Sequence, residues 1–237
     1  MEYIFDQSMK TGDIVTQFPR ASQVLKEYRI DFCCGGNRPI GEAIQDKELN
    51  PEEVLNKINH LYQETIKYGE KDTNWEVENY TTLIDYVLDR HHAYLNKVLP
   101  ELSGYVTKVY RVHGGNHPEL GLVYKLYQQL KVELEHHLIE EEDKIFPKVK
   151  LYEQEKSLEL LKQIVATIDA LESEHETAGS LLKEIREVTN DYQLPEGACN
   201  TYRLTFLKLA ELESDLFDHI HLENNVLFPR LNRELPI

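Results

Sequence analysis

Four long segments of this chain repeat apolar residues at spacings of three and four, and a histidine interrupts each repeat. Residues at these spacings share one face of an α-helix, so each repeat marks a face that packs against other helices. We expect these helices over about 79–103, 118–148, 155–189 and 198–232. Long helices with short connections predict an all-α protein built on an antiparallel four-helix bundle.

Each apolar face contains one histidine, and two faces also carry a glutamate one helical turn later. The histidines are His92, His137, His175 and His219, and the glutamates are Glu141 and Glu223. On the first helix the choice between His91 and His92 stays open, because both share a face with apolar residues. The neighbouring His136 and His221 lie among polar residues, which predicts solvated positions for both.

An internal repeat links the second and fourth helices. His137, Glu141, Phe146 and Pro147 recur at identical offsets as His219, Glu223, Phe228 and Pro229. The same H-x-x-x-E-x-x-x-x-F-P pattern in alternate helices of a bundle predicts pseudo-twofold symmetry, with the two copies meeting across the core.

This combination points to metal binding. An ionised carboxylate that is buried without a partner costs several kcal/mol, and two such glutamates in one core repel each other. A pair of metal ions removes both problems, because carboxylates can bridge the ions and neutral imidazoles can complete the coordination. Imidazole and carboxylate ligands suit Fe, Mn or Zn, and a two-metal site of this kind favours iron. A single histidine on an apolar face is more often a hydrogen-bonded core residue, so only the whole set of histidines and glutamates indicates a metal site.

The remaining organisation is simpler. Residues 1–68 predict a small unit of short helices, residues 69–78 a linker, and residues 79–233 the bundle. Cys33 and Cys34 lie in the first unit, before Gly35-Gly36. They are either two small residues of a buried turn or a redox or iron-handling pair, and Cys199 lies far from them along the chain.

Composition excludes several classes of function. The chain has 26 basic and 42 acidic side chains, a formal charge of −16, which disfavours nucleic acid and anionic membranes as partners. No stretch reaches the roughly 18 apolar residues of a membrane span, and the first residues do not look like a secretory signal. Three cysteines do not make a disulfide framework, so we expect a cytoplasmic protein.

The motifs as a set resemble the di-iron proteins that repair iron–sulfur clusters, the repair-of-iron-centres family, and in particular its Gram-positive-type subgroup. The motifs that carry the resemblance are Asp31-Phe32-Cys33-Cys34-Gly35-Gly36, Asp89-Arg90-His91-His92, Arg111-Val112-His113, His137-x-x-x-Glu141, Glu172-Ser173-Glu174-His175-Glu176 and His219-x-x-x-Glu223-Asn224-Asn225-Val226-Leu227-Phe228-Pro229-Arg230. The resemblance implies a short helical N-terminal domain, a haemerythrin-like bundle and a non-haem di-iron centre with five histidines and two bridging glutamates. It selects His92 over His91 and adds His113, which the helical pattern alone does not select.

The function implied by the resemblance is repair of iron–sulfur clusters after oxidative or nitrosative stress, by an iron donor more than by a classical enzyme. Its partners would be the damaged iron–sulfur proteins. Separately, a small N-terminal domain buries little surface alone and could dock on a second chain, which makes a homodimer a further expectation. The resemblance also favours a functional role for Cys33 and Cys34, as electron donors or iron acceptors. Two alternatives stay open: an oxygen- or nitric-oxide-binding sensor, and a nitric oxide reductase with Glu133 and Glu174 lining a channel.

Overall fold

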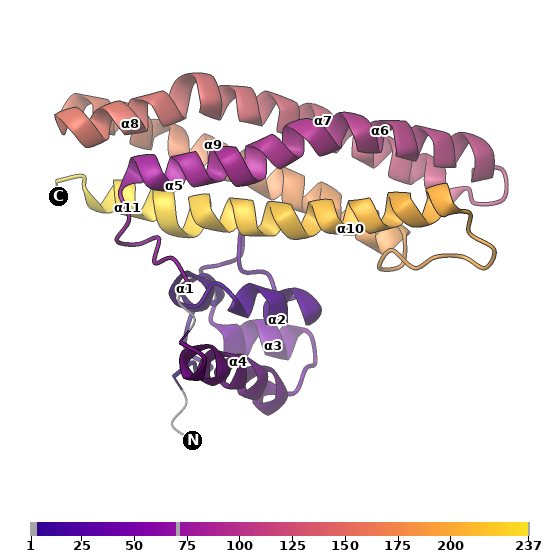
Figure 1. Ribbon diagram of the computed structural model, residues 1–237, viewed down its shortest axis with the longest axis horizontal. Helices are drawn as coiled ribbons and strands as arrows, with labels where there is room; N and C mark the ends of the chain where they lie inside the picture. The colour runs from indigo at the N-terminus through magenta and orange to yellow at the C-terminus, as the bar shows by residue number, and fades with distance from the viewer. Residues whose placement is uncertain (1–3, 70–71, 237) are drawn as a thin grey trace. The chain divides into compact units, whose positions relative to one another are not determined.

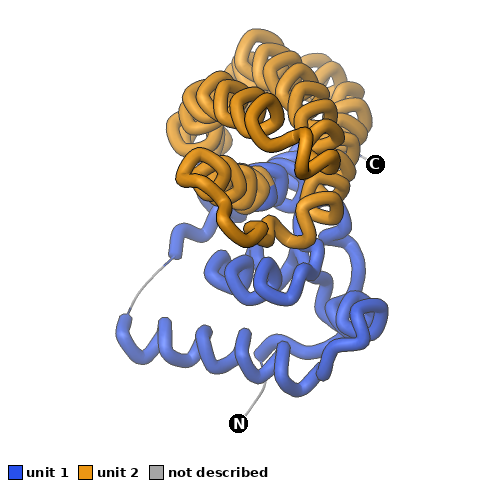
Figure 2. Tube along the Cα trace, turned by 90° about the vertical axis from the view of Figure 1, so that its right-hand side faces the viewer, with its two compact units in different colours: residues 1–79, 217–237 blue, residues 80–216 orange. Residues whose placement is uncertain are grey.

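The computed structural model describes residues 4–69 and 72–236 and confirms the all-α class. Its contacts divide the chain into two compact units, residues 1–79 with 217–237 and residues 80–216 (Figure 2). The predicted linker 69–78 includes residues 70 and 71, which lie outside the described residues. The domain limits 1–68 and 79–233 stay predictions.

Among the described residues, the second unit contains three complete helical runs and most of a fourth, which can be followed in Figure 1. Its elements are α5 (Tyr80–Val87), η1 (Leu88–His92), α6 (Ala93–His113), α7 (Glu119–Glu140), η2 (Glu141–Ile145), α8 (Phe146–Glu155), α9 (Leu158–Val188) and most of α10 (Asn200–His221). Helix α7 packs against both α6 and α9, and α8 packs against α5 and α9. The apolar faces predicted from the sequence are buried in this unit, as Leu130, Leu171 and Leu212 illustrate.

In the part of the chain that the structure describes, three wide π-helical turns interrupt the long helices. They are η1, η2 and η3 (Leu222–Leu227), and each contains or begins with a predicted metal ligand: His92, Glu141 and Glu223. In two of them the Phe-Pro repeat explains the widening. The N–H groups of Phe146 and Phe228 donate to the carbonyls of Glu141 and Glu223, five residues back. The following proline has no N–H and its ring crowds the carbonyl four residues earlier, so a wider turn relieves the clash.

The first helix is longer than expected. Ser103-Gly104 does not end it, and α6 continues through Pro100 to His113. The apolar face continues as well, through the buried Leu102, Val106 and Val109. Burial of this face beyond the proline outweighs the weak helix propensity of glycine, which costs only about 1 kcal/mol relative to alanine.

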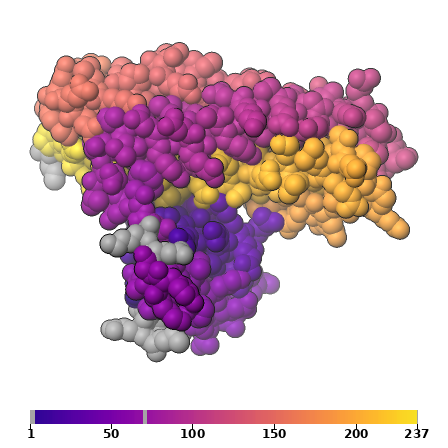
Figure 3. Space-filling view, in the orientation of Figure 1, coloured from indigo at the N-terminus to yellow at the C-terminus, as the bar shows by residue number. Residues whose placement is uncertain are grey.

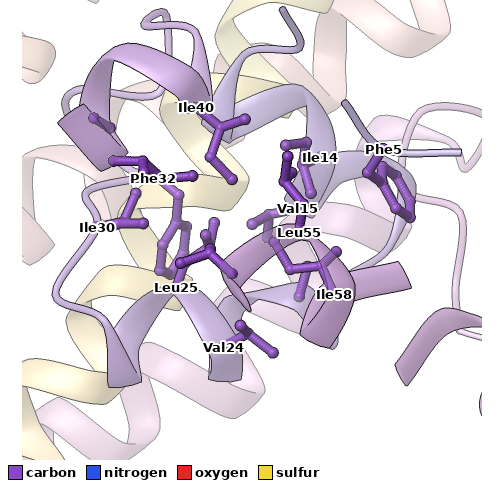
Figure 4. Close-up of a cluster of buried hydrophobic side chains, with 14 of the residues drawn as sticks. Phe5, Ile14, Val15, Val24, Leu25, Ile30, Phe32, Ile40, Leu55 and Ile58 are labelled. Atoms are coloured by element: carbon purple, nitrogen blue, oxygen red, sulfur yellow. The ribbon is translucent and has the colours of Figure 1, made fainter. Parts of the chain in front are cut away.

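The first unit has its own apolar core. It comprises α1 (Thr11–Gln17), α2 (Ala21–Glu27), α3 (Ile40–Asp46), α4 (Pro51–Lys67) and, from residue 217 onward, the end of α10 followed by η3 and α11 (Phe228–Arg233). Figure 4 shows side chains such as Ile14, Leu25, Phe32 and Ile58 meeting in this core. Phe217 of α10 also packs against it.

Candidate metal centre

Six of the seven predicted ligands gather in two overlapping groups. One group is His92, Glu141, His219 and Glu223, and the other is His137, Glu141, His175 and Glu223. Within each group one ligand atom per residue lies within 4.8 Å of the others. All six side chains are buried, and Glu141 and Glu223 are 0% exposed. In the space-filling view, side chains of the second unit fill the spaces between its helices on the face shown (Figure 3).

Both glutamates belong to both groups, which is what a carboxylate bridging two ions requires. Two fully buried carboxylates that lie this close repel each other and have lost their hydration, so the arrangement calls for nearby positive charge. The other donors are imidazoles, which bind metal in the neutral form. Nitrogen and carboxylate donors without a thiolate suit Fe, Mn or Zn, so the residues present fit a pair of such ions.

Carboxylates outside the groups orient two of the histidines. Nδ1 of His92 lies 2.9 Å from Oε1 of Glu142, and Nδ1 of His137 lies 2.8 Å from Oε2 of Glu174. The hydrogen bond with His137 lowers the pKa of Glu174. An acceptor at Nδ1 fixes the proton there and leaves the Nε2 lone pair for a metal.

The Nε2 atoms of these histidines indeed face the buried glutamate. They lie 3.4 Å (His92) and 3.2 Å (His137) from Oε2 of Glu141. Nε2 of His175 approaches Nε2 of His137 at 3.1 Å, and Nε2 of His219 lies 3.0 Å from Oε1 of Glu223. Each histidine therefore presents the same ring nitrogen toward the groups.

His113, the seventh expected ligand, is not in either group. It ends α6, a helix of 21 residues that begins directly after His92. At 1.5 Å per residue this places the two histidines about 30 Å apart along the helix. Its Nε2 instead lies 3.2 Å from Sγ of Cys199, and its ring packs against Tyr202. The structure therefore does not bring His113 together with the other six residues, and the site that we propose below does not include it.

The three histidines that neighbour predicted ligands, His91, His136 and His221, differ in their burial. His136 is exposed, as expected, but His91 and His221 are buried. Nδ1 of His91 lies 3.1 Å from Oδ1 of Asp215. Burial lowers the pKa of His221 to about 4, although its hydrogen bond to the Phe32 carbonyl opposes the shift. The expectation of a solvated face at His221 is wrong, because its polar neighbours contact the N-terminal residues of the same unit.

Cys33 is buried and Cys34 is half-buried, and no disulfide joins them. Their Sγ atoms are 3.9 Å apart. The backbone N–H of Cys33 donates to Oδ1 of Asp31 at 2.9 Å, and its thiol lies 3.4 Å from the same oxygen. The neighbouring Cys34 thiol, burial and the Asp31 carboxylate together raise the pKa of Cys33 well above its ordinary value.

Sequence reasoning missed Glu142, whose only signal is its position beside Glu141. Glu174 was expected near the ligands, and it contacts His137. Glu133, expected with it, is exposed and belongs to neither group.

The fold and the two His/Glu groups define a haemerythrin-like metal-binding protein. Residues 83–231, more than half of the chain, match the family described as the hemerythrin HHE cation binding domain. Residues 7–62 match a second family, described as a domain of unknown function (DUF542). Within the described residues, none of the helices has the length and hydropathy that crossing a membrane requires.

Curated relatives cover nearly the whole chain. The iron-sulfur cluster repair protein ScdA of Staphylococcus haemolyticus is 35% identical over 221 residues, which are 93% of this chain and 96% of that protein. The iron-sulfur cluster repair protein YtfE of Escherichia coli O157:H7 is 36% identical over 219 residues, 92% and 94% of the two chains. The chain therefore belongs to the iron–sulfur cluster repair family.

Proposed function

We propose that this protein repairs damaged iron–sulfur clusters by supplying iron from a di-iron centre. The ligands in this proposal are His92, His137, His175, His219, Glu141 and Glu223. The names of the relatives support the repair role, and the matched cation-binding family supports the bound metal.

The observation that carries the proposal is the pair of glutamates shared by both groups. Glu141 and Glu223 are 0% exposed, and burying two ionised carboxylates side by side is costly unless cations neutralise them. When bound, the two irons supply redox-active metal that can leave the site. The chain's own contribution is to hold six neutral or anionic donors, with Glu142 and Glu174 keeping two imidazole protons at Nδ1.

Iron content tests the centre. We expect about two irons per chain in the protein as purified, and a loss of at least half of the iron in Glu141→Gln and in Glu223→Gln, because an amide is a poor bridge between two cations. Glu176→Gln is the matched control, since Glu176 adjoins His175 but is exposed. Full iron content in both buried variants would disprove the assignment of these ligands.

Transfer of labelled iron tests the mechanism. Protein loaded with an iron isotope is mixed with a damaged iron–sulfur protein, and reactivation is followed together with the label. A donor passes label to the target in proportion to the reactivation. Reactivation without transfer of label contradicts a donor and favours chemistry on nitric oxide or oxygen at the centre.

Cys33 and Cys34 enter the proposal as electron donors or iron acceptors during repair. Their close sulfurs support a joint role, and the high pKa of Cys33 keeps its thiol protonated until a partner removes the proton. The double variant Cys33→Ser/Cys34→Ser is expected to lose repair activity while keeping its iron. Cys199→Ser is the control, because Cys199 is exposed and lies beside His113. Unchanged repair by the double variant would remove the cysteines from the mechanism.

A further inference from the structure

The residue that holds the double-cysteine turn is Asn225, on the wide turn η3. Its side-chain amide donates two hydrogen bonds to the backbone of the turn, to the carbonyl of Phe32 at 3.2 Å and to that of Cys33 at 2.9 Å. The two N–H groups of this one amide thus bind the carbonyls of two consecutive residues, Phe32 and Cys33, which directly precede Cys34.

Two glycines accommodate the other end of the same amide. A Cβ atom on Gly12 would lie 2.3 Å from Oδ1 of Asn225, and one on Gly36 would lie 2.2 Å from it. The glycines are also joined to each other, since the N–H of Gly12 donates to the carbonyl of Gly36 at 2.9 Å. A side chain at either position would displace the Asn225 amide, and one at Gly36 would also crowd the Phe32 carbonyl oxygen at 2.8 Å.

Neighbouring residues of the same unit reinforce this docking. Nδ1 of His221 lies 3.3 Å from the Phe32 carbonyl, and the Phe32 ring packs edge-on against Phe217 at 6.3 Å. Nζ of Lys26 lies 2.6 Å from Oδ2 of Asp218. Polar side chains at the end of α10 and on η3 thus contact both the backbone carbonyls of the cysteine turn and the side chain of Lys26.

Asn225 and Glu223 are two positions apart on one helical segment. Two positions rotate a side chain by roughly 160–200° and advance it by about 3 Å, so the two residues point to opposite sides of the helix. Glu223 faces the His/Glu groups and Asn225 faces the cysteine turn. One turn of helix therefore connects the turn that carries the thiols with a proposed bridging ligand.

We propose that Asn225 is a positioning residue, which fixes the Cys33–Cys34 turn against the helical turn that carries Glu223 and so sets the access and placement of the two thiols. The use of those thiols in repair rests on the proposed function. The positioning itself does not depend on it and can be measured separately.

Thiol alkylation measures the positioning in the iron-loaded full chain. Asn225→Asp keeps the shape of the side chain but removes both N–H donors, and it sets a carboxylate against two carbonyls. We expect alkylation of Cys33 and Cys34 to accelerate roughly tenfold or more, because each lost hydrogen bond favours opening of the turn. Asn225→Ala provides the same test without the added charge.

Three measurements separate positioning from general damage. Asn232→Asp makes the same chemical change at an exposed site in α11 and is expected to leave the rates unchanged. Alkylation of the exposed Cys199 and the iron content of the Asn225 variants are also expected to stay at wild-type values. Unchanged alkylation of Cys33 and Cys34 in both Asn225 variants overturns the proposal, as does acceleration that occurs only with loss of iron.

A double-mutant cycle tests the glycine contact. Gly12→Ala forces a Cβ into the Asn225 amide, so it too is expected to accelerate alkylation. In an Asn225→Ala background the Oδ1 and Cγ atoms of Asn225 are gone and only the Gly36 carbonyl oxygen, at 3.0 Å, still crowds the new Cβ, so the effect of Gly12→Ala is expected to shrink. Equal effects in both backgrounds contradict a shared contact.

Repair assays then separate this proposal from the proposed function. If the thiols act in repair, Asn225→Ala lowers repair activity and adds nothing further in the Cys33→Ser/Cys34→Ser background. If the double-serine variant repairs normally, the proposed role of the thiols fails, while the alkylation rates still decide whether Asn225 positions the turn. If Asn225→Ala lowers repair further in the Cys33→Ser/Cys34→Ser background, Asn225 affects repair by a route other than placing the two thiols, and this role in repair is overturned.

Discussion

At the scale of single residues, His113 and His137 differ in where their helix places them. His137 lies on the buried face of α7, with both ring nitrogens beside carboxylates. His113 lies at the end of α6 beside Cys199. A histidine next to recognisable motif residues is therefore not a ligand unless the helix also brings it to the site.

This difference gives the first prediction. His113→Ala is expected to keep its full iron content, because it removes no donor from either group. His137→Ala removes a donor that lies 3.2 Å from Glu141 and is expected to lose at least half of the iron. Metal analysis of the two variants purified side by side checks this. Equal loss of iron in both variants contradicts the assignment.

The sequence predicted the six residues that gather in the two groups because helical periodicity is local, and a histidine or glutamate on an apolar face can be recognised from its neighbours. It did not predict Glu142, whose partner His92 lies 50 residues away. The polar pattern around His221 and Asn225 was misleading for the same reason, since polar residues can face water or another backbone.

At the scale of secondary structure, the start of α5 depends on a residue from another helix. Oε1 of Glu153 in α8 accepts from the N–H of Tyr80 at 2.6 Å, and Oε2 accepts from the N–H and the hydroxyl of Thr81 at 3.0 and 2.6 Å. The first N–H groups of a helix have no partner within it, so Glu153 acts as a cap supplied through the tertiary structure. Sequence analysis finds caps only in the residues next to the helix.

The second prediction concerns this cap. Glu153→Ala is expected to destabilise the fold by about 0.5–2 kcal/mol, the range for loss of a helix cap. Thermal or denaturant unfolding measures the loss. Glu155→Ala is the matched control, because Glu155 lies on the same helix and is exposed. A control variant that loses as much stability as Glu153→Ala would refute the capping role.

The third prediction is that low pH reduces the contribution of the Glu153 cap to the stability of the fold. Burial opposes ionisation of Glu153, but the hydrogen bonds from Thr81 and Tyr80 outweigh it and hold its pKa below the ordinary value of 4.5. The ionised cap therefore stabilises the fold fully above that value, and the contribution disappears as pH falls through the lowered pKa. The stability difference between the wild type and Glu153→Gln is expected to be constant near neutrality and to shrink in acid. A difference that grows in acid contradicts this sign.

At the scale of the whole molecule, bound metal and stability are linked. An ion that binds only the folded chain stabilises it by about 4 kcal/mol at 1,000 times its dissociation constant. For a chain of this size, about 4 kcal/mol corresponds to roughly 10 °C in melting temperature. We expect a chelator to lower the melting temperature by about this amount and ferrous iron to restore it.

Glu223→Gln sharpens this fourth prediction. Without metal, the wild type must bury two carboxylates that repel each other, whereas the variant buries one. The metal-free variant is therefore expected to melt at or above the metal-free wild type, and its melting temperature should respond less to chelator. A variant that is less stable than the wild type under both conditions contradicts a role of Glu223 in metal binding.

The sequence by itself determined that the chain is helical, that a four-helix bundle forms, and that six histidines and glutamates lie on buried faces, because these properties depend on neighbours within a few turns. The tertiary structure decided what depends on long-range contacts. It placed His113 at the far end of its helix, buried His221, and set Asn225 against Phe32 and Cys33, residues almost 200 positions earlier. The periodicity of the sequence predicts which face of a helix is apolar, but only tertiary packing determines whether a polar face contacts water or another part of the chain.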